Sequence, residues 1–527
     1  MAARTGPLSR RDTLRLSAGA GVAALLAACG GGGGAGSAGT PAAGTAAPNG
    51  AAAITIPTTG AVLPTDNVSF HWIDSGGLKQ TFMQQFVPLY EKAHPNITVQ
   101  YDALPWNEIA KTVPLGVQNG NAPDVFQLPM NFTGGQAVAQ GWIQPLDAII
   151  PNFAQWKAGF PPGIFYEGVT VYQGRTYSFP FWSNKTGDLL LYNVDYLTPA
   201  GIDPQSKPMT WDEYRAVAKK LTQQGSGKYY GVIIEGNQAD RWAAHVRTFA
   251  QPAGAIGASA GGSIQDMNLK TGEFNFASDQ YLAAIDLLLA LKVDGSVFPG
   301  SLSLNGPQAR AQMAQGVAGM ILQGPFNIPQ WKTENPDFHF GVARTPVPNN
   351  AAPVPQMYTP GGGEFFWVYA KSEHPAIAGD IFSYFGSAAG QTAALSITGG
   401  ARQSVFAQAN AAAQLDPRAK QANDIFDQTL HLGPDPNVRN PEWAHVELER
   451  KTVTPDFGTT IQGIYTGHIS NAKQAMLDLK DRADKELDRA IKAAQAKGAS
   501  VSRDDLVFPN WDPTKDYTDG DYAALKK

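Results

Sequence analysis

The chain carries few of the residue patterns that support catalysis. Residues 257–261 match the GxSxG turn that exposes a nucleophilic Ser259, but that turn needs a buried strand before it and a helix after it. Glycine, alanine and proline flank it here, so a hydrolase is the weaker interpretation. No two of the eight histidines lie four residues apart, the spacing with which one helix face holds a metal. We therefore expect no metal site, no cofactor and no enzymatic activity.

Carboxylates and aromatic rings near predicted strand ends suggest binding chemistry instead. Asp74, Asp188 and Glu235 leave glycoside hydrolysis open as an alternative, because two catalytic acids can lie far apart in a chain. Aromatic rings stack on the apolar faces of sugars, while amides and carboxylates bind the hydroxyl groups. For any single tryptophan a place in the core is the better interpretation, and Trp142 and Trp211 are assigned to packing.

Composition sets the scale of the molecule. Its 527 residues are 43% hydrophobic and 16% charged, enough for two to four domains at roughly 100–200 residues each. One cysteine excludes an internal disulfide. A net charge of −5 provides no basic field for nucleic acid, so we expect no such partner.

The first 65 residues have the pattern of an export signal followed by a linker. Arginines precede an apolar run over residues 18–28, which is too short to span a bilayer. Residues 9–14 resemble the twin-arginine export motif. Residues 26–29 resemble a lipobox, which implies cleavage after residue 28 and lipidation of Cys29, with an ordinary signal peptide as the alternative. Glycine, alanine and proline over residues 29–65 predict a flexible linker.

Beyond the linker, strand patterns alternate with helical patterns. Apolar runs at 68–73, 97–101 and 124–128 are separated by helices that begin near Leu78 and Trp106. This alternation predicts an α/β fold with a largely parallel sheet. Further along, residues 210–213 predict a capping box at a helix start, and residues 472–491 repeat apolar positions as in a long amphipathic helix.

Eight short segments, taken in order, resemble the extracellular solute-binding proteins of family 1. These are the sugar-binding receptors of ABC importers, and maltose-binding protein is one of them. Each segment is a weak signal alone, and their order over about residues 66–410 carries the resemblance. The segments are residues 72–74, 94–99, 120–126, 141–147, 174–180, 191–195, 210–213 and 316–320.

The resemblance implies a two-lobe periplasmic-binding-protein-like fold, with a hinge and a ligand cleft between the lobes. Lobe one would comprise residues 66–183 plus 343–400 and lobe two residues 188–342 plus 401–500, followed by a tail over 501–527. Such lobes close on a solute by hinge motion.

The function implied is that of a monomeric, extracytoplasmic lipoprotein that delivers a sugar or oligosaccharide to the transmembrane subunits of an ABC permease. A secreted carbohydrate-active enzyme remains an alternative. So does a receptor of the same fold for another solute, such as a peptide, a polyamine or glycerol phosphate. A phosphate would need convergent cations, and Arg175, Arg241 and Arg402 show no cluster in the sequence.

The resemblance also places ligand contacts at positions of this chain. We expect at least two of the aromatic residues to stack on sugar, and Asp74, Asn131 and Glu235 to bind hydroxyl groups. Glycines at 361 and 362 would let the backbone approach the ligand closely. The full set of predicted contacts is Asp74, Ser75, Asn131, Trp182, Glu235, Trp242, Phe326, Gly361, Gly362, Arg402 and Trp443.

Overall fold

The computed structural model describes residues 54–56, 58–129, 132–257 and 264–525. The export signal, Cys29, Asn131 and the motif around Ser259 therefore lie outside the described residues. Within these described ranges, no helix combines the length and the apolar character needed to cross a membrane.

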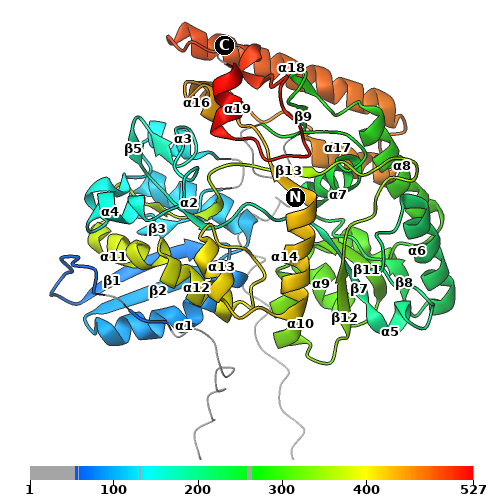
Figure 1. The fold of residues 1–527 in the computed structure, drawn as a ribbon, viewed down its shortest axis with the longest axis horizontal. Helices are drawn as coiled ribbons and strands as arrows, with labels where there is room; N and C mark the ends of the chain where they lie inside the picture. Colours follow the sequence, from blue (N-terminus) through cyan, green and yellow to red (C-terminus); the bar gives the residue numbers. More distant parts are fainter. Residues whose placement is uncertain (1–53, 57, 130–131, 258–263, 526–527) are drawn as a thin grey trace, which may run out of the picture. The chain divides into compact units, whose positions relative to one another are not determined.

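Lobe one is built on a four-stranded sheet in the order β15-β3-β1-β2. The strand β1 (Val68–Asp74) runs parallel to both β2 (Ile97–Ala103) and β3 (Val125–Phe126), while β15 (Trp367–Val368) pairs with β3 in the antiparallel sense. Parallel neighbours need a crossover connection, and α1 (Leu78–Ala93) supplies the one between β1 and β2. Figure 1 shows α1 lying beside these two strands.

The other elements of lobe one come from two distant parts of the chain. They are α2 (Trp106–Asn119), α3 (Gly134–Ala139), α4 (Phe153–Ala158), β4 (Val171–Tyr172), β5 (Arg175–Thr176), β6 (Pro180–Trp182), β14 (Gly363–Phe365), α11 (Pro375–Phe385), α12 (Ala388–Ile397) and α13 (Ala407–Ala412). Aromatic packing joins the two parts. The ring of Phe385 lies 4.8 Å from that of Phe86 and 5.2 Å from that of Phe82, and Trp72 lies 4.9 Å from Phe366.

Lobe two is built on a second four-stranded sheet, ordered β12-β7-β11-β8. Its strands are β7 (Leu189–Asn193), β8 (Tyr230–Val232), β11 (Ala318–Gln323) and β12 (Phe340–Ala343). Alternate residues of β7 pack into cores on opposite faces of the sheet, as the two-residue period of a strand dictates. Both faces are therefore covered, which explains why β7 and β11 are apolar almost throughout.

Helices cover the second sheet and extend the lobe towards the C-terminus. They are α5 (Val194–Leu197), α6 (Trp211–Gly225), α7 (Ala239–Ala250), α8 (Asp279–Val293), α9 (Gly306–Ala314), α10 (Asn327–Glu334), α14 (Pro417–Thr429), α15 (Pro436–Arg439), α16 (Trp443–Glu449), α17 (Phe457–Thr466), α18 (Ala472–Ala496) and α19 (Asp519–Leu525), with the short strands β9 (Met267–Asn268), β10 (Glu273–Phe274) and β16 (Leu430–Leu432).

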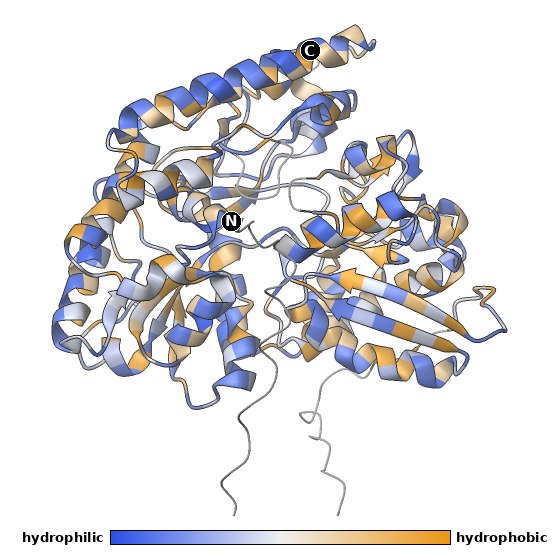
Figure 2. Ribbon diagram, turned by 180° about the vertical axis from the view of Figure 1, so that it is seen from behind, coloured by the Kyte–Doolittle hydropathy of each residue, from blue (hydrophilic) through white to orange (hydrophobic). Residues whose placement is uncertain are grey.

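Two local predictions are confirmed here. Thr210 and Glu213 form the capping box that begins α6, and α18 is the long amphipathic helix. Its apolar stripe, including Met476, Leu479 and Leu487, is buried against lobe two. Figure 2 shows the mostly hydrophilic residues on the rest of that helix.

Crossing segments join the lobes near residues 183–188, 344–362 and 414–416. The second contains β13 (Gln356–Tyr358), which pairs with β16. The amide of Asn184 in the first segment donates to the hydroxyl of Thr359 in the second at 2.9 Å. A hydrogen bond therefore links two of these segments directly.

Packing places three stretches differently from the sequence-based boundaries. Residues 401–413 lie with lobe one, because Phe406 and Ala409 join its core. Residues 501–525, expected as a tail, contribute Phe508 and other apolar side chains to the core of lobe two. The end of the expected linker lies on lobe one, where Ile54, Ile56 and Leu63 pack and the hydroxyl of Thr59 donates to Asp380.

Candidate functional site

Asp74 ends β1 at the carboxyl edge of the first sheet and is fully buried. Its carboxylate accepts the indole N–H of Trp72 at 3.1 Å, the backbone N–H of Gly76 at 2.7 Å and the hydroxyl of Tyr101 at 2.8 Å. Burial raises the pKa of Asp74, and nearby Lys79 and these bonds oppose that rise. Through its bond to Gly76, Asp74 fixes the turn after β1. Gly76 is tightly packed in this turn, since a Cβ added to it would lie 2.9 Å from the Cβ of Ala103.

Glu364 in β14 gathers side chains from three other segments of lobe one. The ammonium of Lys79 lies 2.9 Å from its Oε2, the amide of Gln127 donates to the same oxygen at 3.0 Å, and Arg402 donates to Oε1 at 3.2 Å. Burial opposes ionisation, but the two cations outweigh it and lower the pKa of Glu364 to about 2. Ser75 joins this cluster through its backbone N–H, which donates to Gln127 at 2.9 Å.

The backbone around Glu364 is strained. Glu364 has a φ of +57°, in the left-handed region that side chains disfavour. Gly361 and Gly362 just before it share this conformation, and a Cβ on Gly362 would lie 2.3 Å from that of Pro180. For a non-glycine residue such as Glu364 this conformation costs about 1–3 kcal/mol. Such strain persists where surrounding contacts fix the backbone, and it concentrates at ligand clamps.

Glu235 follows β8 at the corresponding edge of the second sheet and is also buried. Arg241 donates to it at 3.2 Å, Nε2 of His245 lies 2.9 Å away, and the amide of Gln323 donates to it as well. Burial opposes ionisation of Glu235, but Arg241 and the bonds from its neighbours lower its pKa to about 2. Both carboxylate oxygens are therefore occupied by protein donors.

Arg241 extends this second cluster to the first crossing segment. Its Nη2 lies 3.4 Å from both oxygens of Asp188 and donates to the carbonyl of Leu322 at 2.9 Å. The hydroxyl of Thr248 donates to Asp188 at 3.0 Å. Burial lowers the pKa of Arg241, but Asp188 and Glu235 more than compensate and keep it raised. The start of β7 is thus fixed to α7 by charge pairs.

Three of the four predicted stacking rings have no exposed face in this structure. Trp182 and Trp242 are each 1% exposed and Trp443 is 0% exposed. Trp182 packs 4.4 Å from Phe181, while Trp242 donates its indole N–H to a backbone carbonyl and belongs to the core of lobe two. Only Phe326 of these four is partly exposed. The three tryptophans therefore contribute to packing in this conformation.

Phe326 lies after β11 and carries a cation over its ring. The guanidinium carbon of Arg310 is 5.2 Å from the ring centroid. Burial lowers the pKa of Arg310 to about 10, and its hydrogen bonds go to the amide oxygens of Gln330 and Gln323 at 2.8 and 3.5 Å. Next to Phe326, fully buried Asn327 has an Oδ1 with no hydrogen-bond partner among the described residues.

Among the described residues, no group of three histidine, cysteine or carboxylate side chains could hold a metal ion, at the carboxyl edges of the two sheets or elsewhere. The cavity at Asp188 has a volume of only about 10 Å³.

The structure brings Asp74, Ser75 and Arg402 together around the carboxyl edge of the first sheet, and Glu235 and Phe326 around that of the second. Sequence reasoning missed Gln127, which joins Ser75 to Glu364 in the first cluster, and Gln323, which joins Arg310 to Glu235 in the second. Each is a polar residue at the end of an apolar strand, and that pattern could have identified both.

Known proteins that resemble this chain identify its fold and its family. A binding protein from Brucella abortus is 25% identical over 266 residues, which span 50% of this chain and 60% of that protein. The acarbose-binding receptor GacH of Streptomyces glaucescens matches 80% of this chain and 98% of its own at 18% identity, with a TM-score of 0.60. A maltotriose-binding protein of Thermus thermophilus, in complex with maltotriose, matches 79% of this chain and 99% of its own at 21% identity, with a TM-score of 0.58.

These two structures share the two-lobe fold of this chain. Residues 75–392 match the family model described as bacterial extracellular solute-binding protein. That match covers more than half of the 527 residues. The chain therefore belongs to the bacterial extracellular solute-binding protein family.

Proposed function

We propose that this chain is the substrate-binding lipoprotein of an ABC importer, and that it binds a neutral sugar or oligosaccharide between its lobes. Lipidation of Cys29 holds it at the outer face of the membrane. The lobes close on the sugar and present it to the permease. The chain acts as a receptor and carries out no turnover.

The observation that carries the proposal is the pairing of charges at both sheet edges. Lys79 and Arg402 are bound to Glu364, and Arg241 is bound to Glu235 and Asp188. A charged ligand group would compete with these partners, and removing one member of a buried pair costs about 3–5 kcal/mol. A hydroxyl group donates and accepts without displacing a charge, so a neutral polyol fits such edges best.

Groups suited to a sugar lie beside the second cluster. The partly exposed ring of Phe326 offers a stacking surface. The buried Oδ1 of Asn327 has no donor among the described residues, and buried acceptors normally have one. A sugar hydroxyl that enters during lobe closure supplies that donor. Asn131 and Ser75 are proposed to bind further hydroxyl groups from lobe one.

One observation favours a second candidate ligand, a solute that carries a phosphate. Among the residues that the structure describes, Arg310 bonds to amide oxygens and to no carboxylate. A guanidinium in that state is a strong phosphate partner. This candidate ranks second because only one such cation lies beside Phe326, whereas the other arginines and lysines named above are paired.

A thermal-shift panel tests both candidates. We expect glucose, maltose, maltotriose or raffinose to raise the melting temperature, because a ligand at 100 times its Kd adds about 2.7 kcal/mol to the folded state. Glycerol 3-phosphate is the matched anionic probe. A rise with glycerol 3-phosphate alone, or with none of these compounds, would refute the neutral-sugar proposal.

Turnover is measured separately on the same oligosaccharides. We expect no release of reducing ends above the rate in buffer. Release at an enzymatic rate that is lost in Ser259→Ala or Glu235→Gln would establish the enzyme alternative instead.

A further inference from the structure

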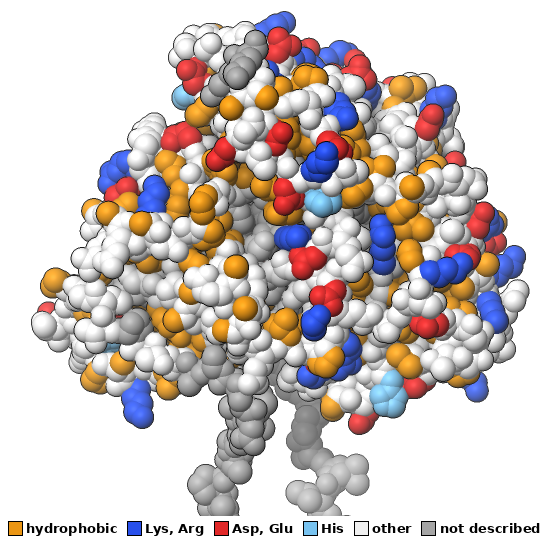
Figure 3. Space-filling model, in the orientation of Figure 1, with side chains coloured by type: hydrophobic (Ala, Val, Ile, Leu, Met, Phe, Trp, Pro, Cys, Tyr) orange, Lys and Arg blue, Asp and Glu red, His pale blue; other side chains and the backbone are white. Residues whose placement is uncertain are grey.

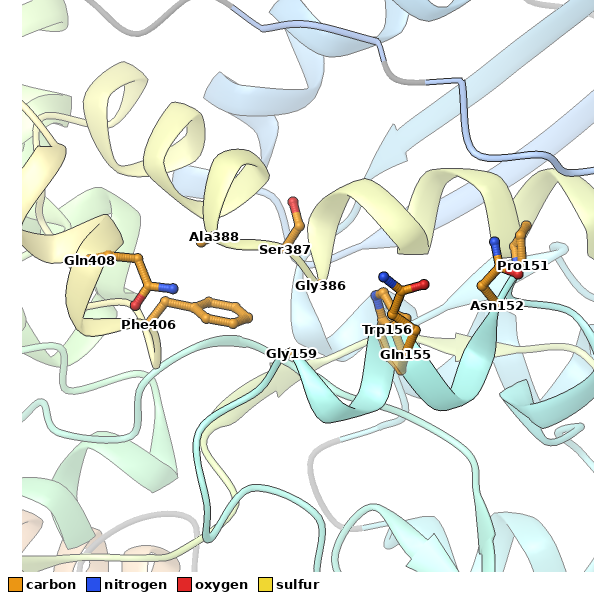
Figure 4. A pocket seen from close by; sticks show the side chains of 10 residues that line it. All are labelled: Pro151, Asn152, Gln155, Trp156, Gly159, Gly386, Ser387, Ala388, Phe406 and Gln408. Atoms are coloured by element: carbon orange, nitrogen blue, oxygen red, sulfur yellow. The ribbon is translucent and has the colours of Figure 1, made fainter.

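A groove on lobe one lies apart from the sheet edges described above. It opens between α4 and the junction of α11 with α12, and α13 forms one end (Figure 4). Its volume is about 410 Å³, within the range of roughly 300–1,000 Å³ that small-molecule pockets occupy. None of the residues that line it belongs to the clusters around Glu364 or Glu235.

The residues that line the groove are uncharged. None of its ten lining residues is acidic or basic, and α12 and α13 contain no charged residue at all. Figure 3 shows few charged side chains on the part of the surface that lies over these helices. An ionic ligand would find no counter-ion among the lining residues.

Trp156 forms a rigid aromatic wall of the groove. Its ring is held in edge contacts by Phe160 and Phe179, at centroid distances of 5.0 and 5.5 Å. A Cβ on Gly386, another lining residue, would lie 2.4 Å from Cζ2 of Trp156 and 2.8 Å from its Nε1. The indole edge therefore lies against Gly386. Its N–H has no hydrogen-bond partner among the residues that the structure describes.

Neutral amides form the rim. Asn152 and Gln155 come from the α4 side, and Gln408 comes from α13. All three are exposed, and their side-chain amides make no hydrogen bond within the described part of the chain. Figure 4 shows Gln408 beside the ring of Phe406, and Gln155 and Trp156 together on the α4 side of the groove.

The geometry points to a second saccharide site in this groove, which binds one neutral hexose unit. The indole supplies a stacking surface, and each amide can both donate to and accept from hydroxyl groups. The three amides offer hydrogen bonds that a purely apolar occupant would not use, and a charged occupant would lack a counter-ion among the lining residues. The assignment rests on this geometry and is independent of the interlobe site.

Fluorine NMR on the full chain labelled with fluorotryptophan tests the site directly. The Trp156 signal is assigned by its loss in Trp156→Phe. We expect D-glucose, D-galactose or maltotriose, at tens of millimolar, to shift this signal saturably. Gln155→Ala combined with Gln408→Ala should weaken the response about tenfold, since two hydrogen bonds are lost. Gln84→Ala, an exposed glutamine of α1 outside the groove, should leave it unchanged.

Three outcomes would overturn the assignment. The Trp156 signal could stay fixed with all three sugars, or the double variant could titrate as the unmodified chain does. The signal could also move with protein concentration in the absence of sugar, which would show that a second copy occupies the groove. Phe326→Ala separates the two sites, because it should weaken interlobe binding and leave the Trp156 response intact.

Discussion

Replacing Glu364 with glutamine tests the charge cluster of lobe one most directly. Glutamine keeps the shape of the side chain but removes the charge that Lys79 and Arg402 share. Lys79 is only 5% exposed, so its ammonium would remain buried without its carboxylate partner. We expect the variant to fold with lower stability, because a buried charge that loses its partner is costly.

The magnitude follows from the pKa. In the folded chain the pKa of Glu364 falls from 4.5 to about 2, and each pKa unit corresponds to about 1.4 kcal/mol, which gives about 3 kcal/mol at neutral pH. Because the folded pKa is the lower one, this stabilisation is complete above about pH 5 and disappears as the pH falls towards 2. At pH 3 about 1 kcal/mol should remain.

Urea unfolding at pH 7 and pH 3 measures this difference. We expect Glu364→Gln to lower the midpoint clearly at pH 7 and much less at pH 3. Glu373→Gln, which alters an exposed glutamate in the same lobe, is the matched control and should change neither midpoint. Equal losses at both pH values, or no loss at pH 7, would show that the charge of Glu364 does not hold this edge together.

Three further predictions concern the ligand, the membrane and the packing of lobe two. Phe326→Ala should weaken sugar binding about fivefold without unfolding the chain, as the loss of a stacking contact worth about 1 kcal/mol implies; calorimetry that shows unchanged affinity would exclude this ring from the site. Cys29→Ala should release the protein from the membrane fraction, and its retention there would refute lipidation as the anchor. Gly458→Ala should destabilise lobe two by about 1–3 kcal/mol, because the added Cβ would lie 1.9 Å from the carbonyl oxygen of Ala239; an unchanged urea midpoint would contradict the close packing of α17 on α7.

Local patterns predicted the framework well. The strands around residues 68–73 and 97–101, the capping box of Thr210 and the amphipathic α18 all depend on residues close together in the chain, so spacing alone reveals them. The order of weak segments identified the family, which the match over residues 75–392 confirms.

The pairing of charges could not be predicted in the same way. Lys79 and Glu364 are 285 positions apart, and no local periodicity links them. Burial of the tryptophans is likewise a property of the assembled lobes. A position at a strand end is compatible with either a ligand contact or a core contact, and for Trp182 and Trp242 the neighbouring rings favour the core.

The split construction of lobe one has a consequence for biosynthesis. On a ribosome, β1, β2 and β3 emerge long before β15, α11 and α12, with the whole sheet of lobe two made in between. Until then Phe82 and Phe86 lack the partner ring of Phe385. Nascent lobe one therefore exposes an apolar sheet face while the strands of lobe two are being synthesised. Intermediates with exposed apolar surface bind chaperones or aggregate. Synthesis of α11 is the step at which lobe one can first complete its aromatic core.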